Sequence, residues 1–114
     1  MPTATYDRFD VVVVPFPFTD KKARKHRPAL VLSSARTFNR AIEHSVMAMI
    51  TSAENAPWPL DTPITELAAA GLSSASVIRL KLFTLDHRFV IRKAGQLAAA
   101  DQAGFQKAFA NAFA

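Results

Sequence analysis

Residues 10–18, which read DVVVVPFPF, constrain the fold of this chain more than any other segment. Four consecutive β-branched valines favour a strand over a helix, and the continuous apolar run is typical of a buried strand. Pro15 and Pro17 donate no backbone N–H, so we expect this strand to bend or to lie at an edge near its end. The run is far shorter than the roughly 20 residues that cross a bilayer as a helix. We therefore expect a β-sheet protein that does not span a membrane.

Three further segments carry strand patterns, namely residues 28–34, 45–51 and 76–84. The third is the clearest, because alternate side chains of a strand point to opposite faces of the sheet. It directs Ile78, Leu80 and Leu82 to one face and leaves Arg79 and Lys81 on the other. We expect that second face to be wet and cationic.

The remaining segments are interpreted as loops and helices. Residues 19–27 and 52–63 are polar or rich in Pro, Ala and Asn, and the second loop holds Trp58 and has room for short extended segments. Residues 65–70 are expected to form a helical turn closed by Gly71. Residues 98–113 place Phe105, Phe109 and Phe113 four apart, which predicts an amphipathic helix with one buried stripe.

These elements predict one domain over residues 1–114, mainly β with helices, built as a compact antiparallel barrel or sheet with helical caps. The apolar content of 50% and the nine Phe exclude a disordered chain. Without Cys there is no disulfide, thiolate metal site or thiol nucleophile, which suits a reducing cytoplasm. Charged residues precede the apolar run, so we expect no secretory signal and a cytoplasmic protein. The net charge of +5 favours a polyanionic partner.

The basic run at residues 21–27 carries five Lys or Arg, enough to hold several phosphates by charge. A solvated loop would have the same composition. Arg27 stands out because Pro28 follows it, so its planar guanidinium sits where a loop becomes a strand, and this geometry suits a phosphate. The alternative for Arg27 is a surface arginine paired with Asp20 or with solvent.

Other polar residues carry weaker signals. Thr51 and Ser52 close a predicted strand, where hydroxyls often only cap a turn. His26, His44 and His87 are scattered, as are the acidic residues, so we expect neither a metal site nor a cofactor. The three glycines form no phosphate-binding loop.

The sequence resembles the PemK/MazF-type toxins of bacterial toxin–antitoxin systems, from about residue 8 to residue 109. The opening DVVVVPFPFTD, followed by RPALVLS at residues 27–33, carries the resemblance, and ITS at residues 50–52 resembles the strand-end motif of that family. The second half adds AGL at 70–72, SVIR at 76–79, FTLD at 83–86 and GQL at 95–97. The chain departs from the family at Phe9, where Gly is usual, and in its basic first loop, where Gly or Ser is common.

The resemblance implies an SH3-like barrel, a homodimer, and a metal-independent endoribonuclease that acts on single-stranded RNA and is neutralised by a cognate antitoxin. The arginine and threonine of the family match Arg27 and Thr51, which are thus the expected catalytic pair. In RNA the 2′-hydroxyl can attack its own phosphorus, leaving a 2′,3′-cyclic phosphate and a 5′-hydroxyl, so no protein nucleophile is required.

The remaining roles are assigned by residue chemistry. Arginine is a poor base near neutrality, which makes His26 a candidate for proton transfer. Phe16 and Phe18 flank the basic loop and are suited either to stacking on bases or to packing in a core or dimer interface. The expected RNA contacts are Lys21, Lys22, Arg24, Lys25, Phe18 and Ser52.

An alternative function stays open, because a fold does not fix a function. A CcdB-like or degenerate toxin on the same barrel would act by binding a partner or nucleic acid without catalysis. Such a binder needs basic charge, but it does not need an arginine and a hydroxyl at two strand boundaries. The pair Arg27 and Thr51 therefore favours the enzyme.

Overall fold

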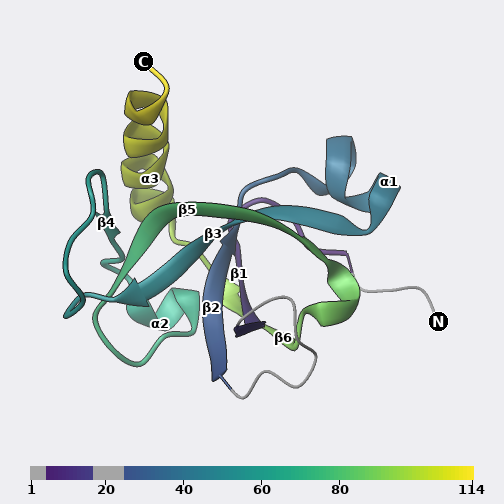
Figure 1. The fold of residues 1–114 in the computed structure, drawn as a ribbon, viewed down its shortest axis with the longest axis horizontal. Helices are drawn as coiled ribbons and strands as arrows, with labels where there is room; N and C mark the ends of the chain where they lie inside the picture. Colours follow the sequence, from purple (N-terminus) through teal and green to yellow (C-terminus); the bar gives the residue numbers. More distant parts are fainter. Residues whose placement is uncertain (1–4, 17–24) are drawn as a thin grey trace.

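The computed structural model describes residues 5–16 and 25–114, and these form a six-stranded antiparallel sheet. The strand order is β4-β5-β3-β2-β1-β6. The sheet curls strongly on itself into a half-barrel (Figure 1). The strands are β1 (Asp10–Phe16), β2 (Lys25–Val31), β3 (His44–Ser52), β4 (Thr62–Pro63), β5 (Ser76–Asp86) and β6 (Arg92–Gln96).

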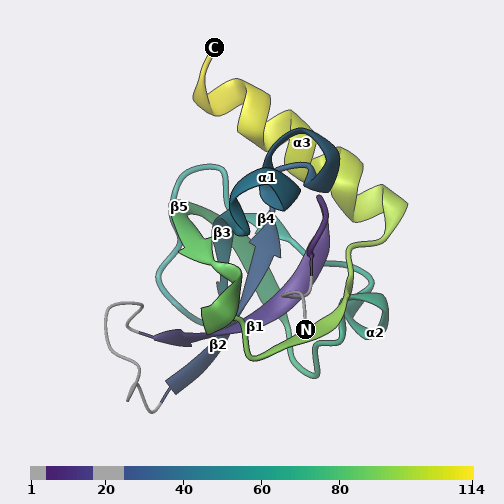
Figure 2. The same cartoon turned by 90° about the vertical axis from the view of Figure 1, so that its right-hand side faces the viewer.

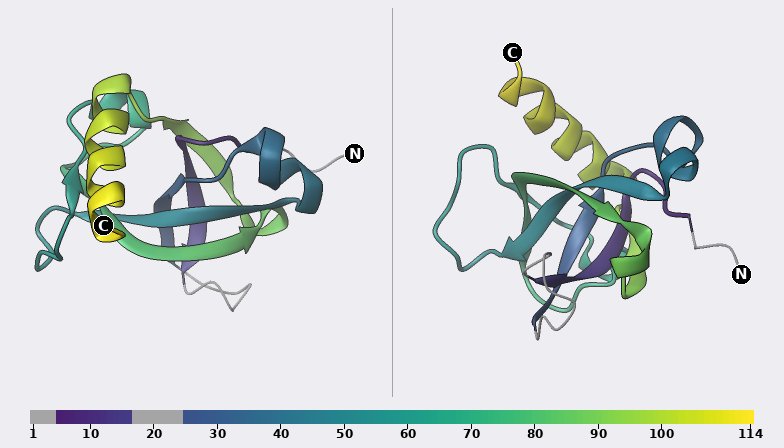
Figure 3. Two further views of the ribbon diagram at one scale, coloured as in Figure 1. Left: turned by 90° about the horizontal axis from the view of Figure 1, so that it is seen from above. Right: turned by 45° about the vertical axis from the view of Figure 1, so that its right-hand side comes forward.

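The helical segments lie at the rims of the sheet, and α3 carries the C-terminus (Figures 1 and 2). Seen from above, α3 and α1 stand at opposite ends of the curled sheet (Figure 3). The segments are η1 (Ala35–Asn39), α1 (Arg40–Ile42), α2 (Leu67–Ala70), η2 (His87–Phe89) and α3 (Ala99–Ala112). The predicted fold, mainly β with a barrel-like sheet and a C-terminal helix, is confirmed.

The sheet has a buried cluster on each face, because successive side chains of a strand point to opposite sides. Val11, Leu30 and Ile50 belong to the cluster beneath α2 and α3, where Leu97 and Phe105 complete it. The opposite cluster contains Val12, Val14, Ala29, Val31, Met47 and Leu85. β1 is thus buried on both faces, as its continuous apolar run predicts.

The C-terminal helix packs through only part of its predicted stripe. Phe105 is 2% exposed and Phe109 packs against the same cluster, whereas Phe113 is 70% exposed and follows the helix as its C-cap. The prediction of one continuous buried stripe was wrong at Phe113, because α3 projects beyond the sheet and the sheet offers no surface there (Figure 1).

One strand boundary and the alternation of one strand differ from the sequence prediction. Lys25, His26 and Arg27 belong to β2 rather than to a loop, because they pair with Phe16, Pro15 and Val14 of β1. The β3–β5 pairing shifts register between Ala48 and Met49, whose partners are Leu82 and Arg79.

That shift interrupts the alternation of β5, so Leu82 is 40% exposed instead of facing a core. Strand β6 and helix η1, which are polar or irregular in sequence, were not predicted.

The predicted turn before Gly71 is confirmed as α2, and Gly71 has φ 74°. A Cβ on Gly71 would lie 2.1 Å from the carbonyl oxygen of Ala94 in β6. Glycine is required at this position both for its backbone angle and for the close approach of the edge strand. The loop of residues 52–63 ends in the two-residue strand β4, one of the short extended segments that the sequence allowed.

Candidate functional site

Arg27 and Thr51 meet where β2 begins and β3 ends. The pairing of these strands stops at Ala29 and Met49, and Pro28 has no N–H with which to extend it. Continuing the register by two residues places Arg27 opposite Thr51 on the same face of the sheet. Both residues line a cavity of about 160 Å³ on that face, and both border a cavity of about 370 Å³ on the other.

The smaller cavity is rich in cations and aromatic rings. The Arg27 guanidinium carbon lies 5.4 Å from the centroid of the Phe16 ring, and the Lys81 ammonium lies 5.8 Å from it. The ring face attracts both cations and holds two positive charges at one place on the surface. The lining residues are Phe16, Arg27, Met49, Thr51, Asn55, Trp58, Arg79 and Lys81.

The Thr51 hydroxyl is oriented by a neighbour that the sequence did not single out. Asn55 Nδ2 donates a hydrogen bond of 2.6 Å to Thr51 Oγ1. A hydroxyl both accepts and donates, so the Thr51 O–H remains a donor. Ser52 is exposed, and its Oγ accepts a 3.2 Å bond from the backbone N–H of Glu54, which is the ordinary turn role of such a residue.

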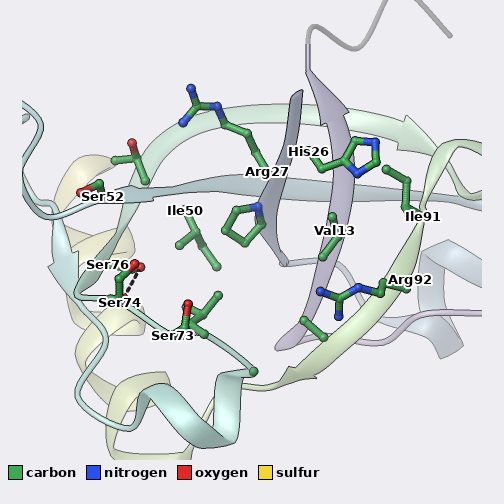
Figure 4. Close-up of a pocket in the computed structure, with 15 residues that line it drawn as sticks. Val13, His26, Arg27, Ile50, Ser52, Ser73, Ser74, Ser76, Ile91 and Arg92 are labelled. Carbon is green, nitrogen blue, oxygen red and sulfur yellow. Dashed lines mark hydrogen bonds between the residues drawn. The ribbon is translucent and has the colours of Figure 1, made fainter. Parts of the chain in front are cut away.

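The larger cavity lies on the opposite face of the same sheet end (Figure 4). His26 borders it beside Ile91 and points away from the Arg27 side chain, since neighbouring residues of a strand alternate. Arg92 of β6 and the serines at 73, 74 and 76 line the rest of this cavity together with Ser52. The site therefore has cations on both faces of the sheet.

The structure brings together four of the predicted site residues, Arg27, Thr51, Ser52 and His26, around these two adjoining cavities. Lys25 is exposed at the first position of β2, opposite Phe16. The other predicted RNA contacts, Phe18, Lys21, Lys22 and Arg24, lie outside the described residues.

Sequence reasoning missed the contributions of Asn55, Trp58 and Arg92. Asn55 and Trp58 lie in an irregular loop, and Arg92 lies in the unpredicted β6. The one signal that could have found a member of this group is that Trp58 is the single tryptophan of the chain. Arg79, predicted on a wet cationic face, is instead only 11% exposed and paired with Asp61.

Two further searches cover residues 5–16 and 25–114. No group of three or more His, Asp or Glu side chains gathers there as metal ligands. None of the helices in this part of the chain is long and apolar enough to cross a membrane.

The fold and the site together define a small barrel-like protein, a curled antiparallel half-barrel with a C-terminal helix and with cationic side chains where β2 begins and β3 ends. Residues 7–113 match the family model described as PemK-like, MazF-like toxin of type II toxin-antitoxin system. The chain belongs to this family. No curated protein sequence matches it significantly.

Solved structures share the fold at low sequence identity. A MazE–MazF structure from Deinococcus radiodurans has a TM-score of 0.73 and 21% identity over 96% of each chain. The Mycobacterium tuberculosis toxin MazF-mt6 has a TM-score of 0.69 and 24% identity over 91% of this chain and 95% of its own. An endoribonuclease in complex with its cognate antitoxin from a mycobacterial species has a TM-score of 0.74 and 17% identity, over 95% and 94% of the two chains.

Proposed function

We propose that this chain is an endoribonuclease toxin that cleaves single-stranded RNA at short sequence motifs without a metal ion. The observation that carries the proposal is the placement of Arg27 and Thr51 on one face where β2 begins and β3 ends, in a cavity with further cations. Membership of the toxin family supports it, as does the similarity to a mycobacterial endoribonuclease of the same fold.

The reaction needs orientation and charge stabilisation rather than a protein nucleophile. The ribose 2′-oxygen loses its proton and bonds to phosphorus, while the bond from phosphorus to the 5′-oxygen breaks and that oxygen gains a proton. The products carry a 2′,3′-cyclic phosphate and a 5′-hydroxyl. Arg27 stabilises the negative charge that builds up on the phosphoryl oxygens, for which a planar, permanently charged guanidinium is well suited.

Thr51 acts beside Arg27 on the same phosphate. Because Asn55 donates to Thr51 Oγ1, the Thr51 O–H is directed away from Asn55 and donates to a phosphoryl oxygen. Asn55 is thus a positioning residue for Thr51.

The two proton transfers require a group that titrates near neutral pH. His26 borders the larger cavity together with Thr51, and imidazole is the side chain that most often transfers protons in catalysis. His26 is the candidate for one of the transfers. Because its exposed side chain points to the face opposite Arg27 (Figure 4), solvent would relay the proton.

The rest of the RNA is held by charge and stacking. Lys21, Lys22, Arg24 and Lys25 contact phosphates, Phe18 contacts a base, and Ser52 adds a hydroxyl beside Thr51. The toxin acts on cytoplasmic RNA as a homodimer, and a cognate antitoxin protein neutralises it. The similarity to an endoribonuclease bound to its cognate antitoxin and to MazE–MazF structures supports the last point.

The deciding experiment is cleavage of a long single-stranded RNA in excess chelator, with mapping of the ends produced. We expect cleavage to persist and to leave 2′,3′-cyclic phosphate and 5′-hydroxyl ends. Arg27→Ala is expected to lower the single-turnover rate at least ~100-fold, the scale seen when one preorganised oxyanion donor is lost. Arg36→Ala, at an exposed arginine of η1, is the matched control and should cleave at the normal rate.

Circular dichroism checks that both variants fold. Strict magnesium dependence or 3′-hydroxyl products would exclude the internal-attack mechanism. A fully active Arg27→Ala variant would remove the main support for an enzyme with this site. RNA binding without any cleavage would instead favour the non-catalytic binding module.

A further inference from the structure

The loop that carries Trp58 is fixed from outside by one arginine. Arg79 of β5 donates from Nε to Asp61 Oδ1 at 3.2 Å and from Nη2 to Asp61 Oδ2 at 2.9 Å. The same Nη2 donates to the carbonyl oxygen of Ala56 at 2.9 Å. Both charged side chains of the pair are 11% exposed, so the pair is largely screened from water. A strand of the sheet thereby holds both sides of the Trp58 loop.

Asp61 also closes the loop upon itself. The backbone N–H of Trp58 donates to Asp61 Oδ2 at 2.9 Å, and the N–H of Asp61 donates to the Trp58 carbonyl at 3.3 Å. Burial opposes ionisation of Asp61, but the hydrogen bonds from Arg79 and Trp58 outweigh it and hold the pKa of Asp61 below its ordinary value. The pair therefore stays charged, and the turn stays closed, throughout the neutral range.

The Arg79–Asp61 pair supports an aromatic ring, that of Trp58, which stays exposed to solvent. The Arg79 guanidinium carbon lies 4.9 Å from the centroid of the Trp58 ring, so a cation backs one face of the indole. Trp58 nevertheless remains 45% exposed. An indole that is restrained on one face and open to solvent elsewhere has already lost most of the freedom that binding would cost it.

The position of the indole connects it with the candidate site. Trp58 lines the same cavity as Arg27, Thr51 and Lys81. One cavity thus offers positive charge, which fits a phosphate, and an aromatic surface, which fits a planar ring. A nucleotide carries a phosphate and a planar base that are separated by one sugar.

We propose that Trp58 is a base-stacking platform of this site, on which the base next to the phosphate held by Arg27 stacks, and that Arg79 and Asp61 are its positioning residues. The inference rests on the proposed function in that its ligand is a single-stranded nucleic acid. Stacking needs only the π-face that every base has, so the platform tolerates all four bases.

The test uses Trp58 itself as the probe, because it is the only tryptophan of the chain. The ligand is a short randomised single-stranded oligodeoxynucleotide, which lacks the attacking 2′-hydroxyl and is not cleaved. We expect it to quench the tryptophan fluorescence. An abasic oligomer of the same length, with the same phosphates, should bind through the cations and leave the emission nearly unchanged.

Affinities measured by anisotropy of a labelled oligonucleotide complete the test. Trp58→Ala is expected to weaken binding of the base-containing oligomer about tenfold and binding of the abasic oligomer much less. Trp58→Phe should restore part of the affinity. Phe113→Ala removes an exposed ring at the far end of α3 and is the matched control, expected to bind normally.

Arg79→Lys tests the positioning role, because lysine cannot donate in a fork to both carboxylate oxygens. It should increase the mobility of Trp58, read as lower anisotropy of its emission in the free protein, and weaken base-dependent binding. Unchanged anisotropy would remove the positioning role.

Equal quenching by the abasic oligomer, or an unchanged affinity of Trp58→Ala, would overturn the platform. If the protein cleaves RNA but Trp58 shows no base-dependent quenching, the proposed function stands and the stacking platform is rejected. Base-dependent quenching without RNA cleavage leaves the platform and rejects the enzyme.

Discussion

At the scale of single residues, the catalysis that we propose is divided between a charge and a hydroxyl. Arg27 supplies a permanent charge from β2, whereas Thr51 supplies a hydrogen bond whose direction depends on Asn55. Charged hydrogen bonds are about twice as strong as neutral ones. The two residues should therefore differ in what their removal costs.

Thr51→Ala is expected to reduce the single-turnover cleavage rate by the same kind of effect as Arg27→Ala, but by a smaller factor. Asn55→Ala should give part of the Thr51→Ala loss and add little to it in the double variant, because both act through one hydroxyl. Rates of the three variants on one RNA check this. Additive losses would mean that Asn55 acts independently of Thr51.

His26→Ala is expected to cost least of the three site substitutions, because the imidazole is exposed and points to the face opposite Arg27. Its effect should lie mainly in the shape of the pH–rate profile, because it would remove one proton carrier. A loss as large as that of Arg27→Ala would make His26 the principal proton carrier and would contradict this ranking.

At the scale of elements, one buried carboxylate helps to attach the first turn of α3. Asp101 accepts from the Thr65 hydroxyl at 2.6 Å and from the backbone N–H groups of Thr65 and Glu66, each at 3.0 Å. Burial opposes ionisation of Asp101, but these hydrogen bonds outweigh it and hold its pKa below the ordinary value. The carboxylate thus joins the first turn of α3 to the segment that leads into α2.

Asp101→Asn is expected to lower the free energy of unfolding by about 1–3 kcal/mol at neutral pH, because it leaves buried donors without full partners. A lowered carboxyl pKa stabilises the fold fully above the unfolded value of about 3.9. This contribution disappears as the pH falls through the lowered value. Urea titrations along the acid range should show the difference shrinking there, while Glu54→Gln, in an exposed loop, stays near wild type.

The segment that joins β1 to β2 is expected to contribute affinity rather than chemistry. The residues that flank this segment, Phe16 of β1 and Lys25 of β2, pair with each other beside Arg27. Changing Lys21, Lys22, Arg24 and Lys25 together to Ala should weaken binding of a single-stranded oligonucleotide and flatten the logarithmic salt dependence by up to about 3. Binding measured over a range of salt concentrations checks this. An unchanged slope would refute the role.

The strands with strong local patterns were predictable, and so was the pair formed by Arg27 and Thr51. Local periodicity predicts which segments are strands, and the resemblance to the PemK/MazF-type family identifies Arg27 and Thr51. The Trp58 loop was not predictable, because its support is a contact between Arg79 and Asp61, 18 residues apart, in a segment without periodicity. β6 was not predicted for a similar reason, since its polar sequence becomes a strand only through pairing with β1.

At the scale of the whole molecule, exposed apolar side chains bear on assembly. Among the described residues, Phe38, Ile42, Leu60, Ile91 and Phe113 are large hydrophobic residues open to solvent. Exposed apolar side chains of this size are available to a partner, and homo-oligomers are most often two-fold dimers. The proposed homodimer would cover part of this surface.

We expect light scattering at micromolar concentration to give the mass of two chains of 12.5 kDa. A sample that scatters only as a monomer over that range would contradict the proposed homodimer. Addition of the antitoxin is a separate measurement and does not decide this point.

The pairing of β1 with β6 joins Asp10 to Gln96 across 86 residues of sequence. A ribosome adds about 5–20 residues per second, so β1 is synthesised seconds before β6, the strand that pairs with its second edge. The pairing of β6 with β1 is thus the last strand pairing that the order of synthesis permits, and only the packing of α3 follows it. A nascent chain that stalls before Gln96 therefore emerges with one edge of β1 still unpaired.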